Sequence, residues 1–206
     1  FSYLIAENGI DRMTKEECLV ELNKSAKVLM SRIDDILDMS LISINNIPVK
    51  KERVNVNELV RDIYTSYKSK LGLSSNLIEY RLNLLNTENP IYIECDWQLI
   101  NKAITHLLDN SFKFTLEGFV ELGISFAGDG DLNIYVKDSG VGISAENLTK
   151  LTDPFYQEDA SSIKKFGGVG LGLSIVNGIA RILGVKFSID SKKGYGTFAL
   201  LKIGIR

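Results

Sequence analysis

The sequence predicts an α+β fold, in which a helical hairpin fragment precedes a two-layer α/β sandwich with a mixed sheet and helices on one face. Before residue 46, apolar residues recur at spacings of three and four, as they do along one side of a long helix. After residue 47, short segments of alternating apolar residues are interspersed with helix-like segments, which favours strands and helices packed in layers. We therefore expect two domains, residues 1–46 and 47–206.

A heptad seam dominates the first predicted domain and is typical of a coiled coil or a helical bundle. Thr14 and Glu17 have the spacing of a capping box, so we expect the helix to begin near Thr14. Gly9 marks a turn before it, and Pro48 interrupts the helical pattern after it. A simple amphipathic helix packed on its own domain is the alternative. The seam consists of Leu19, Leu22, Ala26, Leu29, Ile33 and Ile36.

The second predicted domain contains three expected helices and several short strands. Asn57 is expected to cap a helix over residues 58–71. Apolar residues at helical spacing predict a second helix over 97–114, and a third over 170–183 that ends at Gly184. Strands are expected near 54–56 and over 78–84, 91–94, 118–126, 132–137, 185–190 and 197–203.

Two glycine-rich stretches carry the strongest indication of function. The first, residues 138–143, ends a strand-like segment with one carboxylate, Asp138, and two glycines, Gly140 and Gly142. The second, residues 167–173, opens a helix-like segment. Glycine lets a backbone approach a ligand closely, and a helix N-terminus offers free N–H groups and positive potential to a phosphate. Together the two stretches predict a nucleotide pocket.

A polar stripe on the expected helix 97–114 supplies further chemistry for such a pocket. His106, Asn110 and Lys113 share one face of this helix, whereas Ser111 falls on the apolar face. The stripe offers an imidazole, an amide oxygen for a hard cation and an ammonium for a phosphate. Mg²⁺ prefers oxygen ligands and is often shared with substrate phosphates. The alternative is a polar face that is merely solvated.

In this order, the segments resemble the catalytic core of sensor histidine kinases, which belong to the ATPase superfamily shared with DNA gyrase and MutL. The chain further resembles kinases of hybrid two-component systems in Bacteroides-like bacteria. The first domain resembles part of the dimerisation hairpin of these kinases. The matching motifs are the N box at 107–115, the first glycine box at 138–143, the F box at 153–157, the second glycine box at 168–173 and the last glycine box at 194–198.

The resemblance implies a role for each site residue. Asp138 is expected to accept a hydrogen bond from the exocyclic amine of adenine, Asn110 to ligate Mg²⁺, and Lys113 to reach a phosphate. An ATP lid is implied at residues 144–167, where Phe155 packs against the hairpin. The other implied nucleotide-binding residues are Gly140, Gly142, Ile143, Lys164, Lys165, Gly168, Gly170, Leu171, Gly172 and Thr197.

The only histidine of the sequence, His106, lies at the edge of the N box, directly before residue 107, at a position where related kinases usually carry Asn. It is interpreted as a polar contact near the phosphates, a structural residue packed beside the site, or a catalytic base. The phospho-accepting histidine of the family is not among these residues. We expect the sequence to begin downstream of it, with a natural pseudokinase as the alternative. In either case the chain is expected to bind ATP without phosphorylating itself on the usual residue.

The resemblance therefore implies a protein histidine kinase that uses ATP and Mg²⁺. Its implied partners are a histidine-bearing hairpin of its own or a partner subunit and a response-regulator receiver domain, in a homodimeric, membrane-anchored bacterial sensor whose cytosolic portion contains this chain. A gyrase-like or MutL-like ATPase clamp is one alternative, which turnover without a histidine substrate would favour. A non-catalytic, partner-binding pseudokinase module is another, which failure to bind adenine nucleotides would favour.

Composition limits the remaining possibilities. The net charge of −2 gives no electrostatic reason to expect nucleic acid or an anionic membrane as partner. No apolar run approaches the ~20 residues of a membrane span. Cys18 and Cys95 fall in different expected elements with apolar neighbours, so we expect two buried free thiols.

Overall fold

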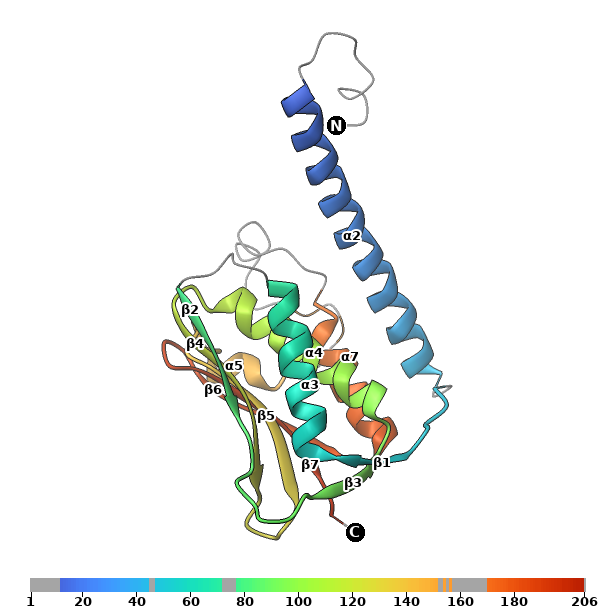
Figure 1. The fold of residues 1–206 in the computed structure, drawn as a ribbon, viewed down its shortest axis with the longest axis vertical. Coiled ribbons are helices and arrows are strands. Elements are labelled where there is room, and N and C mark those ends of the chain that lie inside the picture. The colour runs from blue at the N-terminus through green and yellow to red at the C-terminus, as the bar shows by residue number, and fades with distance from the viewer. Residues whose placement is uncertain are drawn as a thin grey trace.

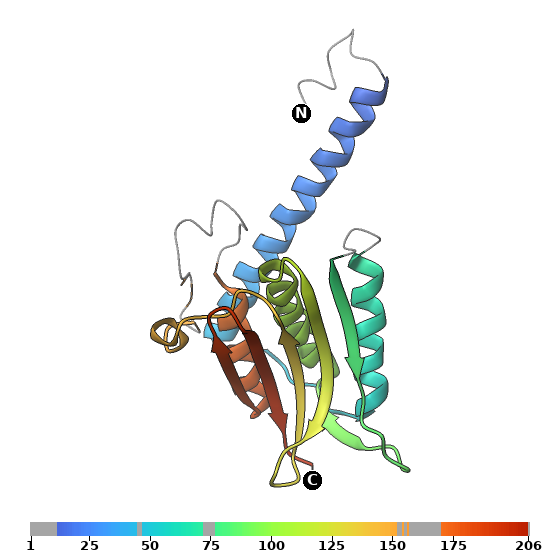
Figure 2. The same cartoon turned by 90° about the vertical axis from the view of Figure 1, so that its left-hand side faces the viewer.

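The computed structural model describes residues 12–44, 47–71, 77–151, 154, 156 and 170–205, with side chains from Glu16 onward. A five-stranded mixed sheet forms one layer, and helices pack on one of its faces (Figures 1 and 2). This arrangement confirms the predicted fold class. In order across the sheet, the strands are β2 (Ile78–Asn83), β4 (Gly118–Phe126), β5 (Leu132–Asp138), β7 (Gly196–Ile203) and β6 (Lys186–Lys192).

The sheet is mixed because β2 runs parallel to β4, whereas the other neighbouring strands are antiparallel. A separate two-stranded ribbon pairs β1 (Glu52–Asn55) with β3 (Tyr92–Cys95). Each strand lies within a few residues of its predicted position. The β4–β5 hairpin connects adjacent antiparallel strands.

Three helices cover the sheet: α3 (Val56–Leu71), α4 (Trp97–Phe114) and α7 (Gly172–Leu183). Their apolar faces meet the inward side chains of β4, β5 and β7 in one core. Fully burying an aliphatic side chain stabilises a fold by about 1.5–3 kcal/mol. The largest fully buried side chains between the helices and the sheet are Ile100, Ile104, Leu108, Leu122, Leu132, Ile134, Ile175, Ile179 and Leu201.

The start of α3 differs from the prediction by two residues. Asn55 caps this helix, because its Oδ1 accepts hydrogen bonds from the backbone N–H groups of Asn57 (3.1 Å) and Glu58 (3.5 Å). Asn57, the predicted cap, instead exchanges two hydrogen bonds with the backbone of Leu85. The prediction was wrong because Asn57 serves a loop distant in sequence. At the other end of the domain, α7 begins at Gly172 and ends at Gly184, whose φ of 68° suits a helix C-cap.

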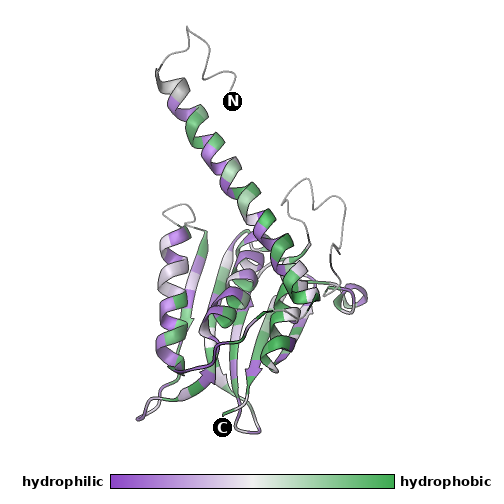
Figure 3. Cartoon of the chain, turned by 90° about the vertical axis from the view of Figure 1, so that its right-hand side faces the viewer, coloured by the Kyte–Doolittle hydropathy of each residue, from purple (hydrophilic) through white to green (hydrophobic). Residues whose placement is uncertain are grey.

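The long helix α2 (Arg12–Ser43) extends away from the sandwich (Figure 1). Thr14 lies inside α2, so the predicted capping box does not begin this helix. Among the described residues, the last turns of α2 pack on the body, where Ile42 is 1% exposed and meets α7 at Gly178. Figure 3 shows apolar residues along the part of α2 that projects outward. The exposed apolar side chains there include Leu19, Val28, Leu29, Met30, Ile33, Ile36 and Leu37.

Two further expectations concern the cysteines and membrane-spanning segments. Cys18 and Cys95 are both free and buried, as predicted. Within the described ranges, no helix has the length and apolar character needed to cross a membrane.

Replacing Asp96 with Ala should destabilise the domain by about 2 kcal/mol, since it removes a helix cap and three hydrogen bonds to a buried carboxylate. Asp96 is 6% exposed. Its Oδ1 accepts from the N–H groups of Gln98 and Leu99, both at 3.1 Å, and its Oδ2 accepts from that of Lys50 at 2.8 Å. Urea denaturation measures the loss. The exposed Asp62→Ala variant in α3 is the control, and equal midpoints for both variants would contradict the prediction.

Candidate nucleotide-binding site

Asp138 is the centre of the site and lies at the end of β5 with 7% of its surface exposed. Its Oδ1 accepts hydrogen bonds from the backbone N–H groups of Gly140 (3.0 Å) and Thr197 (3.1 Å). Its Oδ2 accepts one from the hydroxyl of Ser111 at 2.8 Å. Because a carboxylate has about four lone-pair sites, one position on Oδ2 stays open for a donor from a ligand.

Burial raises the pKa of Asp138 above its usual range, although the hydrogen bonds from Gly140, Ser111 and Thr197 oppose this shift. An acceptor held in place and shielded from bulk water suits recognition of an N–H donor such as an exocyclic amine. Thr115 borders the same space, and its Oγ1 is buried without a hydrogen-bond partner in the described part of the chain. An ideal Cβ at Gly140 would lie 2.8 Å from that atom and 3.0 Å from Asp138 Oδ1.

Glycines let three segments meet at Asp138. A Cβ at Gly140 would lie 2.6 Å from the carbonyl oxygen of Phe114, at the end of α4. Gly142 has a φ of 63°, and a Cβ there would lie 2.0 Å from the carbonyl oxygen of Lys192. Gly196 has a φ of 94°, and its Cβ would lie 2.0 Å from the carbonyl oxygen of Asp138. At Gly140 and Gly142 of the first glycine motif, neighbouring backbone therefore occupies the space that a side chain would need.

Backbone hydrogen bonds lock the same segments together. The N–H of Gly194 donates to the carbonyl of Val141 at 2.7 Å, and the N–H of Ile143 donates to Ser191 Oγ at 2.9 Å. Ser191 in turn shares a hydrogen bond of 2.9 Å with the hydroxyl of Thr197. The structure thus brings Thr197 next to Asp138 and Ile143, although Thr197 is far from both in sequence.

His106 and Asn110 lie beside the start of α7. An ideal Cβ at Gly172 would lie 3.5 Å from Asn110 Nδ2, 3.9 Å from Asn110 Oδ1 and 3.8 Å from His106 Nδ1. Both side chains therefore face the helix N-terminus that the sequence predicted to face phosphate. Gly170, just before α7, has a φ of 77°, a conformation that favours glycine.

His106 also faces α2, because its Nε2 lies 3.9 Å from Asp35 Oδ1. Burial lowers the pKa of His106, and the nearby carboxylates of Asp35 and Asp109 oppose this shift. The imidazole is therefore neutral near pH 7 and has a nitrogen lone pair for a polar contact. Next to this pair, Lys102 of α4 forms an ion pair with Asp38 of α2.

Lys113 is half-buried at the last turn of α4, with its Nζ 4.7 Å from the ring centroid of Phe114. Burial lowers the pKa of Lys113, and the positive charge of Arg32 on α2 lowers it further. Its role as a phosphate contact stays a prediction.

The predicted lid is described only in part. Ser144 precedes the short helix α5 (Ala145–Leu148), and Tyr156 donates a hydrogen bond of 2.6 Å to Asn147. Leu171 is 2% exposed, so its side chain is a core residue. The predicted residues that lie outside the described ones are Phe155, Lys164, Lys165 and Gly168.

Sequence reasoning missed two contributors. Ser111 was assigned only to the apolar face of α4, but its hydroxyl reaches across to Asp138. Asp35 received no role from the sequence, but it faces His106. A buried serine within an otherwise apolar helical face was the available signal for the first contact. The second depends on how α2 packs, which no local pattern specifies.

The donor set fits a Mg²⁺ ion that arrives with a nucleotide. The described residues include no cluster of three or more His, Cys, Asp or Glu side chains that could hold a metal ion. The side-chain oxygen of Asn110, beside the start of α7, provides a single hard donor. Mg²⁺ typically takes one or two protein ligands together with phosphate oxygens and water.

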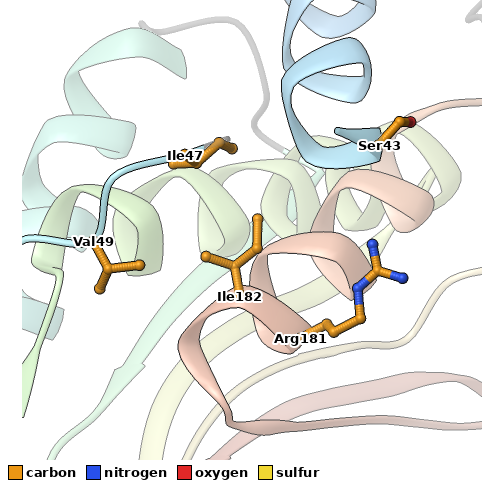
Figure 4. Close-up of a pocket in the computed structure, with 5 residues that line it drawn as sticks. All are labelled: Ser43, Ile47, Val49, Arg181 and Ile182. Carbon is orange, nitrogen blue, oxygen red and sulfur yellow. The ribbon is translucent and has the colours of Figure 1, made fainter. Parts of the chain in front are cut away.

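A groove elsewhere on the molecule does not belong to this site. It lies between the end of α2, the following segment and the C-terminal half of α7, as Figure 4 shows. Because α7 begins at Gly172 beside Asn110, the groove is at the opposite end of this helix. Its lining residues are Ser43, Ile47, Val49, Arg181 and Ile182.

The fold and the surroundings of Asp138 favour a nucleotide-binding domain. Residues 95–205 match the family of histidine kinase-, DNA gyrase B- and HSP90-like ATPases, so the chain belongs to this family and its domain binds ATP. The curated relatives that the chain matches include histidine kinases.

Similar proteins support this assignment. The chain is 30% identical over 200 residues to sensor histidine kinase RcsC of Escherichia coli (strain K12). This alignment covers 95% of this chain and 20% of the relative. It is 29% identical to the autoinducer 2 sensor kinase/phosphatase LuxQ of Vibrio cholerae, over 95% of this chain and 23% of the relative. The chain therefore spans about a fifth of the length of these curated relatives.

Solved structures share the fold. Full-length ShkA in complex with AMPPNP has a TM-score of 0.74 and 22% identity, over 97% of this chain and 40% of that one. The Acinetobacter baumannii histidine kinase AdeS has a TM-score of 0.72 and 20% identity, over 99% of this chain and 90% of that one.

Proposed function

We propose that this chain is the part of a hybrid-type sensor kinase that transfers the γ-phosphate of ATP to a histidine on a dimerisation hairpin. The phosphoryl group would then pass to an aspartate of a response-regulator receiver domain. The observation that carries the proposal is the buried carboxylate of Asp138, which retains one open acceptor position and lies in the same domain as a helix start flanked by His106 and Asn110.

The geometry supports phosphoryl transfer by positioning. Asp138 would bind adenine, and the start of α7 with Asn110 and His106 would face the phosphates. Mg²⁺, when bound, would neutralise charge on the phosphates. An imidazole nitrogen of the hairpin would attack the γ-phosphorus as the bond to the β-phosphate oxygen breaks. ADP would leave, and the imidazole would lose its proton to solvent or a neighbouring base.

The exposed apolar residues of α2 support pairing with a further helix. We propose that this surface belongs to a dimerisation hairpin and that the parent protein is a homodimer. Similarity to sensor histidine kinases supports a cytosolic location for the domain in a membrane-anchored bacterial sensor. The net charge of −2 supports neither nucleic acid nor an anionic membrane as partner.

Calorimetric titration with ADP and a non-hydrolysable ATP analogue, with and without Mg²⁺, tests the site. A second experiment supplies labelled ATP and a separate histidine-bearing hairpin, and follows label on its histidine. Transfer that disappears when this histidine is replaced supports the proposal. Phosphate release without any histidine substrate would favour a clamp ATPase instead, and a folded chain that binds no adenine nucleotide would refute the proposed site.

Replacing Asn110 with Ala should reduce the gain in ATP-analogue affinity that Mg²⁺ confers by about tenfold, which corresponds to one lost metal–ligand contact of ~1.4 kcal/mol. Affinity measured in EDTA should stay nearly unchanged. The matched control is Asn133→Ala, on the sheet face that carries no helices. An equal loss of affinity with and without Mg²⁺ would contradict a metal-binding role for Asn110.

A further inference from the structure

The contact between Ser111 and Asp138 joins two elements that are otherwise held together by apolar packing. Ser111 is 6% exposed and lies on the face of α4 that includes Ile104, Leu107 and Leu108. A serine within a helix often bonds back to the carbonyl four residues earlier. Here its hydroxyl instead donates across the helix–sheet interface to Asp138 Oδ2 at 2.8 Å.

The two oxygens of Asp138 are used unequally. Oδ1 accepts two backbone N–H groups and is fully occupied. Oδ2 accepts only the Ser111 hydroxyl, and this is the oxygen with a remaining lone pair. The backbone donors of Gly140 and Thr197 hold one side of the carboxylate, so the serine is the side-chain group that controls how Oδ2 is presented.

We infer that Ser111 is a positioning residue for adenine recognition, because its hydroxyl occupies one lone pair of Asp138 Oδ2 and directs the other toward the exocyclic amine. The inference rests on the proposed adenine contact of Asp138 and extends it to a residue that does not itself touch the base. Loss of the hydroxyl leaves a carboxylate that is held through Oδ1 alone and lacks one of its three donors.

Ser111 also favours the ionised form of the Asp138 carboxyl group. The hydrogen bond from Ser111 lowers the pKa of Asp138, against the stronger effect of burial. Only the ionised carboxylate keeps Oδ2 as a pure acceptor. Nucleotide affinity should therefore decline as pH falls through the pKa of Asp138, and removal of Ser111 should move this decline to higher pH. The groups that face Asp138 from neighbouring elements are Ser111, Gly140 and Thr197, none of which titrates in this range.

The experiment compares Ser111→Ala with the wild type for two ligands, ADP and purine riboside 5′-diphosphate, which lacks the exocyclic amine. We expect ADP affinity at pH 7 to fall about tenfold and the affinity of the second ligand to change less than about twofold. The acidic decline of ADP affinity should move to higher pH in the variant. Ser125→Ala, in β4 on the sheet face without helices, is the control and should leave both ligands unaffected.

Comparing two ligands on one variant separates positioning from a loss of folding, since a folding defect weakens both. Equal weakening of both ligands, or an unchanged pH profile, would overturn the inference. Unchanged ADP affinity in Ser111→Ala beside weakened affinity in Asp138→Asn would overturn it while leaving the proposed site intact. Failure of the wild type to bind ADP would instead refute the proposed site, and this inference with it.

Discussion

Replacing Asp138 with Asn should weaken ADP binding by about 100-fold, or ~3 kcal/mol, with little change in the stability of the domain. The amide oxygen of Asn can still accept from the N–H groups of Gly140 and Thr197, as Oδ1 of Asp138 does. Its amide nitrogen would then replace Oδ2 and donate to Ser111 Oγ, which can accept. The internal contacts are preserved, but a donor now faces the exocyclic amine of adenine, which is also a donor.

The same exchange should change which base is preferred. An inosine nucleotide carries a carbonyl acceptor where adenosine carries the amine, so the variant should bind IDP better relative to ADP than the wild type does. Isothermal titration of both ligands gives this ratio. Asp129→Asn is the charge-matched control, because Asp129 lies in the β4–β5 turn and pairs with Lys202. An unchanged ratio would show that Asp138 does not contact the base.

Much of the sandwich could be predicted from the sequence because its elements have strong local periods. The face of α4 that contains Ile100, Ile104 and Leu108 is fully buried, as the 3.6-residue pattern indicated. Alternation in β4 and β5 likewise placed Val120 and Val136 inward. The order of strands across the sheet, which places β7 between β5 and β6, is a product of tertiary pairing and has no signature in any single segment.

The candidate site was predictable where its motifs are local and missed where it depends on packing between elements. Asp138 and Gly140 are two residues apart, so one short motif contains both. The contact of Asp138 with Ser111 spans 27 residues, and that with Thr197 spans 59. A serine on an apolar helical face and an asparagine that bonds a distant loop, as Asn57 does, look the same in sequence as residues with purely local roles.

Gly142→Ala should cause the largest loss of stability among these variants, about 4 kcal/mol. Part of this loss is conformational, because an L-residue held near a φ of 63° costs about 1–2 kcal/mol. The rest is steric. The new Cβ would lie 2.0 Å from the carbonyl oxygen and 2.7 Å from the carbonyl carbon of Lys192, and a backbone peptide cannot rotate away as a flexible side chain can. Relieving such overpacking typically costs a further 1–3 kcal/mol or so.

Gly184 offers a close match for separating the two contributions. Its φ is 68°, and a Cβ there would meet no atom within 4 Å, so Gly184→Ala should lose only the conformational part, about 1 kcal/mol. Urea denaturation of both variants gives the steric part as the difference. If Gly142→Ala loses more stability than Gly184→Ala, the backbone around Gly142 is tightly packed. This packing lies at the junction where the N–H of Gly194 donates a 2.7 Å hydrogen bond to the carbonyl of Val141, beside Asp138. Equal losses would mean that the junction yields readily, and that Gly142 is needed for its backbone conformation alone.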